Sequence, residues 1–121
     1  MHRLCRQAKN EDMRLHYCEY CGRTQGAYET HHITPKGMGG ASPIREIRAN
    51  KINLCVECHD LAHDEKVERS ELYVRVAVRE NVAVREVYEA NKLAVPENIE
   101  ELETEKEELK QERTGAFWMP N

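Results

Sequence analysis

The spacing of apolar residues along the chain predicts a mixed fold of short strands and helices. Ala27–Ile33 and Lys51–Leu54 are short stretches of β-branched, aromatic and aliphatic residues, a pattern typical of strands. Residues 1–16 show little periodicity and predict a loose or helical lead-in. Helical patterns follow in four stretches, from Cys55 to His63, from Ser70 to Glu80, from Val84 to Leu93 and from Glu97 to Arg113.

The stretch Ser70–Glu80 has features of both secondary structures. Three valines alternate with other residues as in a strand, whereas Ser70 offers an N-cap and Glu71 a first-turn acid for a helix. Asn81 suits the left-handed conformation that often ends a helix. We therefore expect a helix. Its short connection to the next helix leaves a DNA-reading helix-turn-helix open, beside simple packing against the rest of the protein.

The C-terminal stretch is strongly charged. Pro96 interrupts the chain, and residues 97–113 then carry only a thin apolar stripe, which predicts a helix with one narrow packing face. We expect Gly115 to end this helix and Phe117-Trp118 to fold back onto the body. The helix is either solvated, or the C-terminal helices form a homodimer.

The composition predicts a small core that needs an additional source of stability. Leu, Ile, Val and Phe together make up only 23 of the 121 residues. With so few apolar residues, their burial barely offsets the conformational entropy that the chain loses on folding. Small domains of this kind commonly gain the missing stability from a structural metal. The net charge of −4 argues against non-specific coating of nucleic acid. The acidic excess lies after residue 66, so a local basic surface before it remains open.

Cysteine usage points to metal binding. No apolar run approaches membrane-spanning length and no signal peptide is evident, so we expect a soluble, cytoplasmic protein without a membrane partner. In a reducing compartment, the pairs Cys18/Cys21 and Cys55/Cys58 predict metal ligands rather than disulfides. A structural Zn²⁺ held by four thiolates is the natural occupant. An iron–sulfur cluster and four unligated thiols are the alternatives. Cys5 is left over as a free thiol.

Four histidines lie among these cysteines and suggest a second metal site. His59 and His63 are four residues apart on the predicted helix and therefore share a face. His31 and His32 are adjacent on a predicted strand and therefore point to opposite sides. One of this pair can bind a metal ion while the other accepts a proton from water. A divalent ion held by three imidazoles keeps positions open for a phosphate oxygen. The alternative is that some of these imidazoles only line the core or the surface.

Together, His31-His32-Ile33-Thr34-Pro35, Gly39-Gly40 and the stretch from Asn50 to His59 resemble the HNH endonuclease family, in its variant with two cysteine pairs. The resemblance covers about residues 18–63. It implies a small zinc-stapled ββα-metal finger of the α+β class, with helical N- and C-terminal extensions. We place the nuclease core at residues 1–69 and a helical accessory region at 70–121.

The resemblance also implies a role for each matching residue. His32 matches the general base, and His31 matches the metal ligand before it. His59 and His63 match the two helical ligands of the catalytic ion. Asn50, nine residues before His59, matches the asparagine that orients the loop carrying the base or touches the metal.

The expected activity is metal-dependent hydrolysis of DNA phosphodiester bonds. His32 would activate water, and one divalent ion (Mg²⁺, Mn²⁺, Ni²⁺ or Zn²⁺) would neutralise charge that develops on the phosphate. Four basic residues near the motif are expected to contact the DNA backbone: Lys36, Arg45, Arg48 and Lys51. The alternative is a non-catalytic zinc module that binds nucleic acid or protein.

Overall fold

A computed structural model describes residues 3–9, 17–35 and 45–118 of the chain, with side chains as far as residue 112. Its centre is an antiparallel hairpin of β1 (Tyr28–His32) and β2 (Lys51–Cys55), followed directly by α2 (Val56–His63). The register pairs His31 with Ile52 and His32 with Lys51. The predicted α+β class, with a ββα core, is confirmed.

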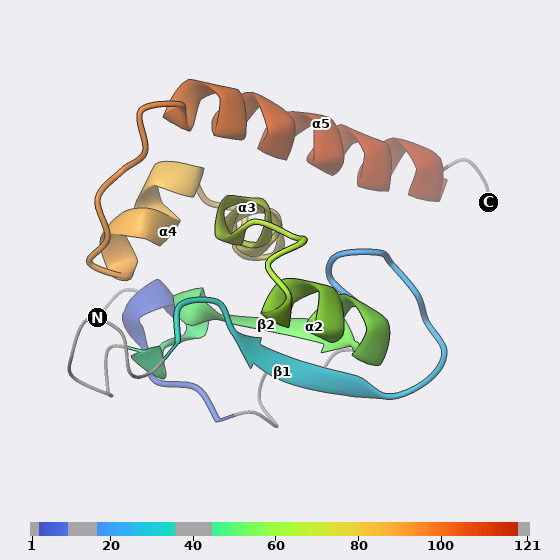
Figure 1. The fold of residues 1–121 in the computed structure, drawn as a ribbon. Coiled ribbons are helices and arrows are strands. Elements are labelled where there is room, and N and C mark those ends of the chain that lie inside the picture. The colour runs from blue at the N-terminus through green and yellow to red at the C-terminus, as the bar shows by residue number, and fades with distance from the viewer. Residues whose placement is uncertain (1–2, 10–16, 36–44, 119–121) are drawn as a thin grey trace.

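Helices cover this core in successive layers (Figure 1). Helix α3 (Arg69–Glu80) packs against β2, while α4 (Val84–Ala90) and α5 (Ile99–Trp118) pack on α3 from the other side. Every residue of β2 is buried. The uniform burial follows from this layering, since the strand contacts β1, α2 and α3 at once. The domain boundary at residue 69 stays a prediction, although α3 and β2 share one core.

The element boundaries differ in part from those expected. Helix α3 forms despite its alternating valines, because its buried side chains also include Leu72, Tyr73 and Ala77 at helical spacing. It begins at Arg69 rather than Ser70, and the Glu71 carboxylate accepts the backbone N–H of Glu68 at 3.1 Å. The prediction of Ser70 as N-cap is therefore wrong.

The ends of the C-terminal helices also shifted. Asn81 ends α3 in the left-handed conformation, as predicted (φ 56°, ψ 50°). Helix α4 ends at Ala90 instead of Leu93, and α5 continues past Gly115 to Trp118. The side chains of Phe117 and Trp118 lie outside the described residues, so their packing stays a prediction.

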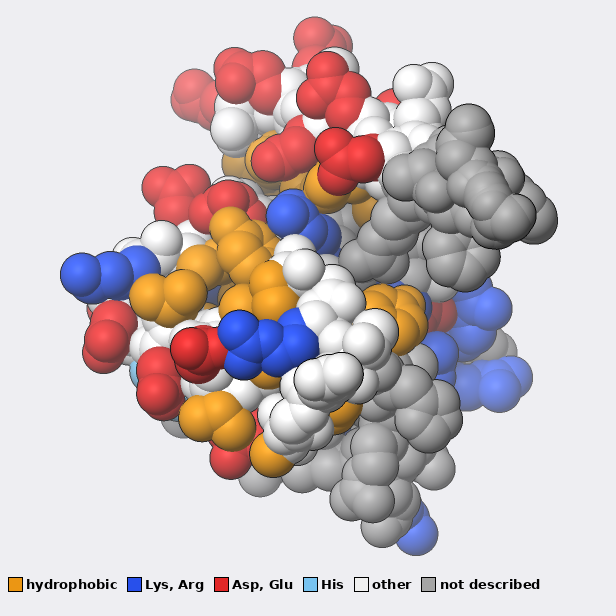
Figure 2. All heavy atoms as spheres, turned by 90° about the vertical axis from the view of Figure 1, so that its right-hand side faces the viewer, with side chains coloured by type: hydrophobic (Ala, Val, Ile, Leu, Met, Phe, Trp, Pro, Cys, Tyr) orange, Lys and Arg blue, Asp and Glu red, His pale blue; other side chains and the backbone are white. Residues whose placement is uncertain are grey.

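The surface of α5 is acidic. Figure 2 shows acidic side chains gathered over this helix at the top of the molecule. Ile99 and Leu102 face the core, which confirms the thin apolar stripe. The exposed acidic residues are Glu100, Glu101, Glu107, Glu108 and Glu112. Dimerisation through the C-terminal helices stays a prediction. No helix in the described part of the chain is long and apolar enough to cross a membrane.

A buried ion-pair network joins the first cysteine pair to α3. The Arg79 guanidinium donates to both carboxylate oxygens of Glu19 at 3.1 Å and to Glu80 at 2.6 Å. Glu19 and Glu80 are almost fully buried, and Arg48 also donates to Glu80, at 2.7 Å. Buried charges are tolerated when they are paired in this way. The network therefore fixes the loop that follows Cys18 against the helical layer.

Candidate metal centres and nuclease site

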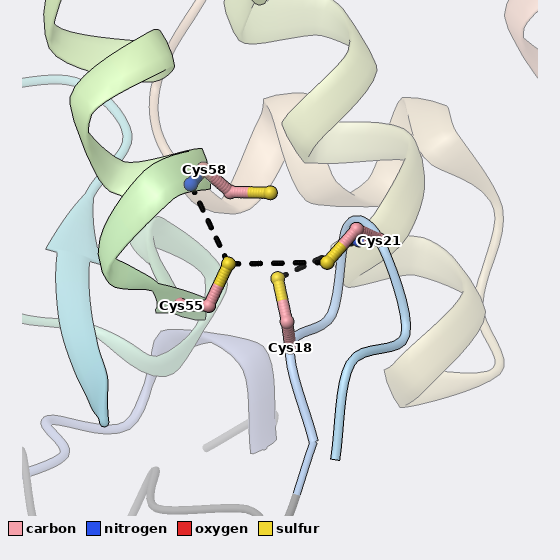
Figure 3. Close-up of side chains that lie close together, drawn as sticks. All are labelled: Cys18, Cys21, Cys55 and Cys58. Atoms are coloured by element: carbon pink, nitrogen blue, oxygen red, sulfur yellow. Dashed lines mark hydrogen bonds between the residues drawn. The ribbon is translucent and has the colours of Figure 1, made fainter. Parts of the chain in front are cut away.

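The four cysteines converge from two segments (Figure 3). Cys18 and Cys21 lie in the loop before β1, while Cys55 ends β2 and Cys58 lies in the first turn of α2. Gly22 follows with a φ of +81°, a conformation that favours glycine and turns the chain after the second thiol. Backbone N–H groups of Cys21 and Cys58 each lie 3.5 Å from the sulfur three residues earlier. Both pairs therefore form hooks that aim two sulfurs at one point.

The distances between the sulfurs fit a tetrahedral metal ion. All four Sγ atoms lie within 4.8 Å of one another. Four sulfurs bound to one zinc ion at about 2.3 Å lie about 3.8 Å apart. The Sγ atoms of Cys21 and Cys55 are 3.8 Å apart, and all four cysteines are free of disulfides. A set of four thiols leaves no open position, so the cluster is a structural metal site, and its donor set suits zinc.

Burial raises the pKa of these thiols, whereas hydrogen bonds from backbone N–H groups lower it. Burial alone would raise the pKa of Cys18, but N–H donors from Cys21, Cys55 and Tyr20 outweigh it and lower this pKa to about 7. Burial, followed by the hydrogen bond with Cys55, raises the pKa of Cys58. Cys18 is therefore prepared to bind as a thiolate, whereas Cys58 needs the cation itself to become one.

Three histidines form the second ligand group. His31 on β1 and His59 and His63 on α2 have nitrogens within 4.8 Å of one another. The Nε2 atoms of His59 and His63 are 3.0 Å apart. Two nitrogens bound to one ion at about 2.0–2.1 Å would lie about 3.0–3.4 Å apart. The imidazoles predicted to share a catalytic ion are thus brought together, and their spacing fits one.

The environment of His31 favours the neutral form that a metal requires. Burial, followed by repulsion from His59 and His63, lowers the pKa of His31 to about 4. Its side chain is 9 % exposed. A neutral imidazole presents a lone pair to a cation, so His31 is available as a ligand throughout the neutral pH range.

Glu29 is a further residue of this site that was not predicted from the sequence. Its Oε1 accepts a hydrogen bond from Nδ1 of His59 at 2.5 Å, across the hairpin from β1 to α2. A carboxylate accepts only, so Nδ1 carries the proton and Nε2 of His59 is left as the donor of a lone pair. The pattern was visible, because Glu29 lies two residues before His31 and therefore on the same face of β1.

His32 stands outside this ligand group. It lies at the end of β1 and its Nε2 is 3.1 Å from Oε2 of Glu46. Both His31 and His32 nevertheless line a cavity of about 870 Å³, together with His59, His63, Glu68 and Arg69. His32 is therefore separate from the three-histidine group yet lines the same cavity, and its role as the base stays a prediction. Arg69 was not predicted, and it is a basic residue that lines this cavity.

Asn50 is buried completely and orients backbone rather than contacting the ligand group. Its Oδ1 accepts the N–H of Thr34 at 2.9 Å, and its Nδ2 donates to the carbonyls of Thr34 and Arg45 at 2.9 and 3.0 Å. The hydroxyl of Tyr73 donates to the same Oδ1 at 2.8 Å. These bonds fix the chain just after His32. Of the two roles expected for Asn50, these bonds fit the orienting one, which stays a prediction.

The expected DNA contacts need correction at two of the four positions. Arg45 is 3 % exposed and Lys51 is 1 % exposed, so neither faces a duplex. Lys51 instead forms an ion pair with Glu46, and Arg48 donates to the buried Glu80. Lys36 lies outside the described residues. These positions were predicted from charge alone, which does not distinguish a solvent-facing cation from one that pairs inside the fold.

Comparison with known proteins identifies the central stretch. No curated protein and no solved structure matches the chain, whereas the model of the HNH endonuclease family matches residues 18–65. Both ligand groups lie inside this range. Residues 18–65 are thus similar to the HNH endonuclease family, and they carry a four-cysteine site of the zinc type.

Proposed function

We propose that the protein is a DNA endonuclease that hydrolyses phosphodiester bonds with one divalent ion at His31, His59 and His63. The family match supports a nuclease-type function. The observation that carries the finer proposal is one cavity lined by the three-histidine group and by His32, which does not belong to that group. A purely structural zinc module has no need for a second, open ligand group.

In this mechanism the chain supplies a base, ligands and a shaped cavity. His32 accepts a proton from water as the water oxygen bonds to phosphorus and the bond to the leaving 3′ oxygen breaks. The three-histidine group holds an ion that, when bound, neutralises negative charge on the phosphate and the leaving oxygen. Asn50 keeps His32 in place through the backbone of Thr34. Arg69, in the cavity wall, adds positive charge near the phosphate.

The ion itself is proposed only by class. Imidazole ligands suit Zn²⁺ and Ni²⁺, while phosphate chemistry commonly uses Mg²⁺ or Mn²⁺. Glu29 favours a metal bound through Nε2 of His59, because it occupies Nδ1 of the same ring. A well-placed general base contributes about 10²–10⁴ in rate, so most of the activity should depend on His32.

Incubation of supercoiled plasmid with the protein tests the proposal. We expect nicked or linear DNA when Mg²⁺, Mn²⁺ or Ni²⁺ is added and no cleavage in excess chelator. Circular dichroism and zinc content should be measured in the same samples, because a chelator that strips the structural site would also unfold the chain. DNA binding without cleavage under every metal would instead support the non-catalytic zinc module.

A further inference from the structure

Lys51 is a completely buried cation that has no part in the proposed nuclease mechanism. A lysine is rarely buried completely unless it is paired, and this one lies on β2 directly opposite His32 on β1. Its Nζ is 2.9 Å from Oε1 of Glu46 and also donates to the carbonyl of Ala8. The other carboxylate oxygen of Glu46, Oε2, is the one that contacts His32.

The geometry points to Glu46 as a positioning residue for His32, held in its orientation by Lys51. The inference rests on the proposed function, in which His32 is the base. A carboxylate paired with a buried lysine is ionised and therefore accepts hydrogen bonds only. The bond at 3.1 Å must then be donated by Nε2 of His32. In the neutral ring, Nδ1 is consequently the nitrogen with the lone pair that can take a proton from water.

The backbone of Glu46 is fixed independently of its side chain. The N–H of Ala8 donates to the carbonyl of Glu46 at 3.0 Å, and Gln7 forms an isolated β-bridge with Ile47. Residues 7 and 8 lie outside the range that matches the nuclease family. A segment of the N-terminal extension therefore supports the residue that orients the base, which gives this extension a role in the site.

Glu46 and Lys51 make different contributions to the orientation of His32. Glu46 selects one tautomer of His32 and one ring orientation, and it does not touch the substrate. Lys51 keeps Glu46 ionised and in place, since its own buried charge needs a carboxylate. Removing Glu46 alone would take this carboxylate away from a buried cation and destabilise the fold, so a clean test must neutralise both partners together.

The test compares two double variants, Glu46→Gln/Lys51→Met and Glu46→Ala/Lys51→Met. Both lack the buried charge pair, but only glutamine retains an oxygen that can accept from Nε2 of His32. We expect the alanine variant to lose about 10- to 100-fold in kcat for plasmid cleavage relative to the glutamine variant, a share of the rate that a base supplies. KM and the affinity for added Ni²⁺ should agree within about twofold, because neither variant removes a ligand. Glu108→Ala, on the exposed face of α5, serves as the control and should match the parent.

A second readout does not depend on cleavage. Imidazole ¹⁵N shifts should show His32 in the Nε2–H tautomer in the parent and in the glutamine variant, and in a mixture of tautomers in the alanine variant. Equal rates and equal tautomers in the two double variants would overturn the inference, as would an alanine variant that loses Ni²⁺ affinity in proportion to its rate. If the parent does not cleave DNA under any metal, the nuclease proposal fails, while the tautomer comparison still decides the role of Glu46.

Discussion

Replacing Asn50 with alanine should reveal how strongly the segment behind His32 depends on one buried amide. The substitution removes the partner of the Thr34 N–H and of the carbonyls of Thr34 and Arg45. Tyr73 keeps a second partner, since its hydroxyl is also 2.6 Å from the Thr34 hydroxyl. Three buried backbone groups would thus be left unsatisfied, at about 1–3 kcal/mol each. We expect Asn50→Ala to lower the free energy of unfolding by about 3–9 kcal/mol.

Asn91 offers a matched control, because it is also completely buried but makes fewer bonds. Its Nδ2 donates to the carbonyls of Ala49 and Val87, and Val87 also accepts the backbone N–H of Asn91. Its Oδ1 accepts no hydrogen bond within the described part of the chain. Asn91→Ala therefore leaves one carbonyl without a donor and also removes an unsatisfied oxygen, so its cost should be only about 1 kcal/mol.

Urea unfolding of the zinc-loaded variants, followed by circular dichroism, measures both costs. Zinc content must be equal in all samples, so that the comparison reports hydrogen bonds rather than metal loss. A cost below about 1 kcal/mol for Asn50→Ala, or an equal cost for the two asparagines, would refute the reasoning.

Three further substitutions and conditions test other parts of the structure. Cys58→Ser should lose zinc and the folded state, since a structural site can contribute about 10–16 kcal/mol in small zinc fingers; a folded, zinc-free variant with native melting would contradict this. Glu29→Ala should weaken divalent-metal affinity by about 10- to 100-fold in calorimetry, with Glu108→Ala unchanged, because His59 loses the acceptor that orients it. Without metal at the histidines, the pH dependence of unfolding should reflect His31, because burial lowers its pKa from about 6.5 to about 4 in the folded state. The free energy of unfolding should therefore fall by about 3 kcal/mol in total as the pH drops from about 6.5 to about 4. In urea titrations across this range, His31→Asn should show a correspondingly smaller loss, and an equal loss would contradict the assignment.

The two ligand groups were predictable because their spacing is local. A two-residue gap places both thiols of a pair on one turn, and a four-residue gap places His59 and His63 on one helix face. The helical layers followed from apolar spacing, apart from their ends. Helix ends depended on contacts such as the bond between the Glu71 carboxylate and the backbone of Glu68, which a residue pattern describes only loosely.

The roles of the charged residues were not predictable in the same way. Lys51 was expected at the DNA backbone, but its burial depends on Glu46 and on Ala8, forty-three positions away in the chain. Arg48 likewise meets Glu80 through the tertiary packing of α3. Partners that meet through tertiary packing leave no periodic trace in the sequence, so charge near a motif was a poor guide to what faces the substrate.

The proposed roles of His32 as the base and His59 as a metal ligand can be separated by one measurement. Nicking rates of the parent, His32→Ala and His59→Ala should be measured against increasing Mn²⁺ or Ni²⁺. We expect His32→Ala to bind metal and DNA like the parent but to lose about 10²–10⁴ in rate at every metal concentration. His59→Ala should instead need more metal, and part of its rate should return as metal is added. A His32→Ala protein that cleaves at the parental rate, or that extra metal fully rescues, would contradict this division of roles.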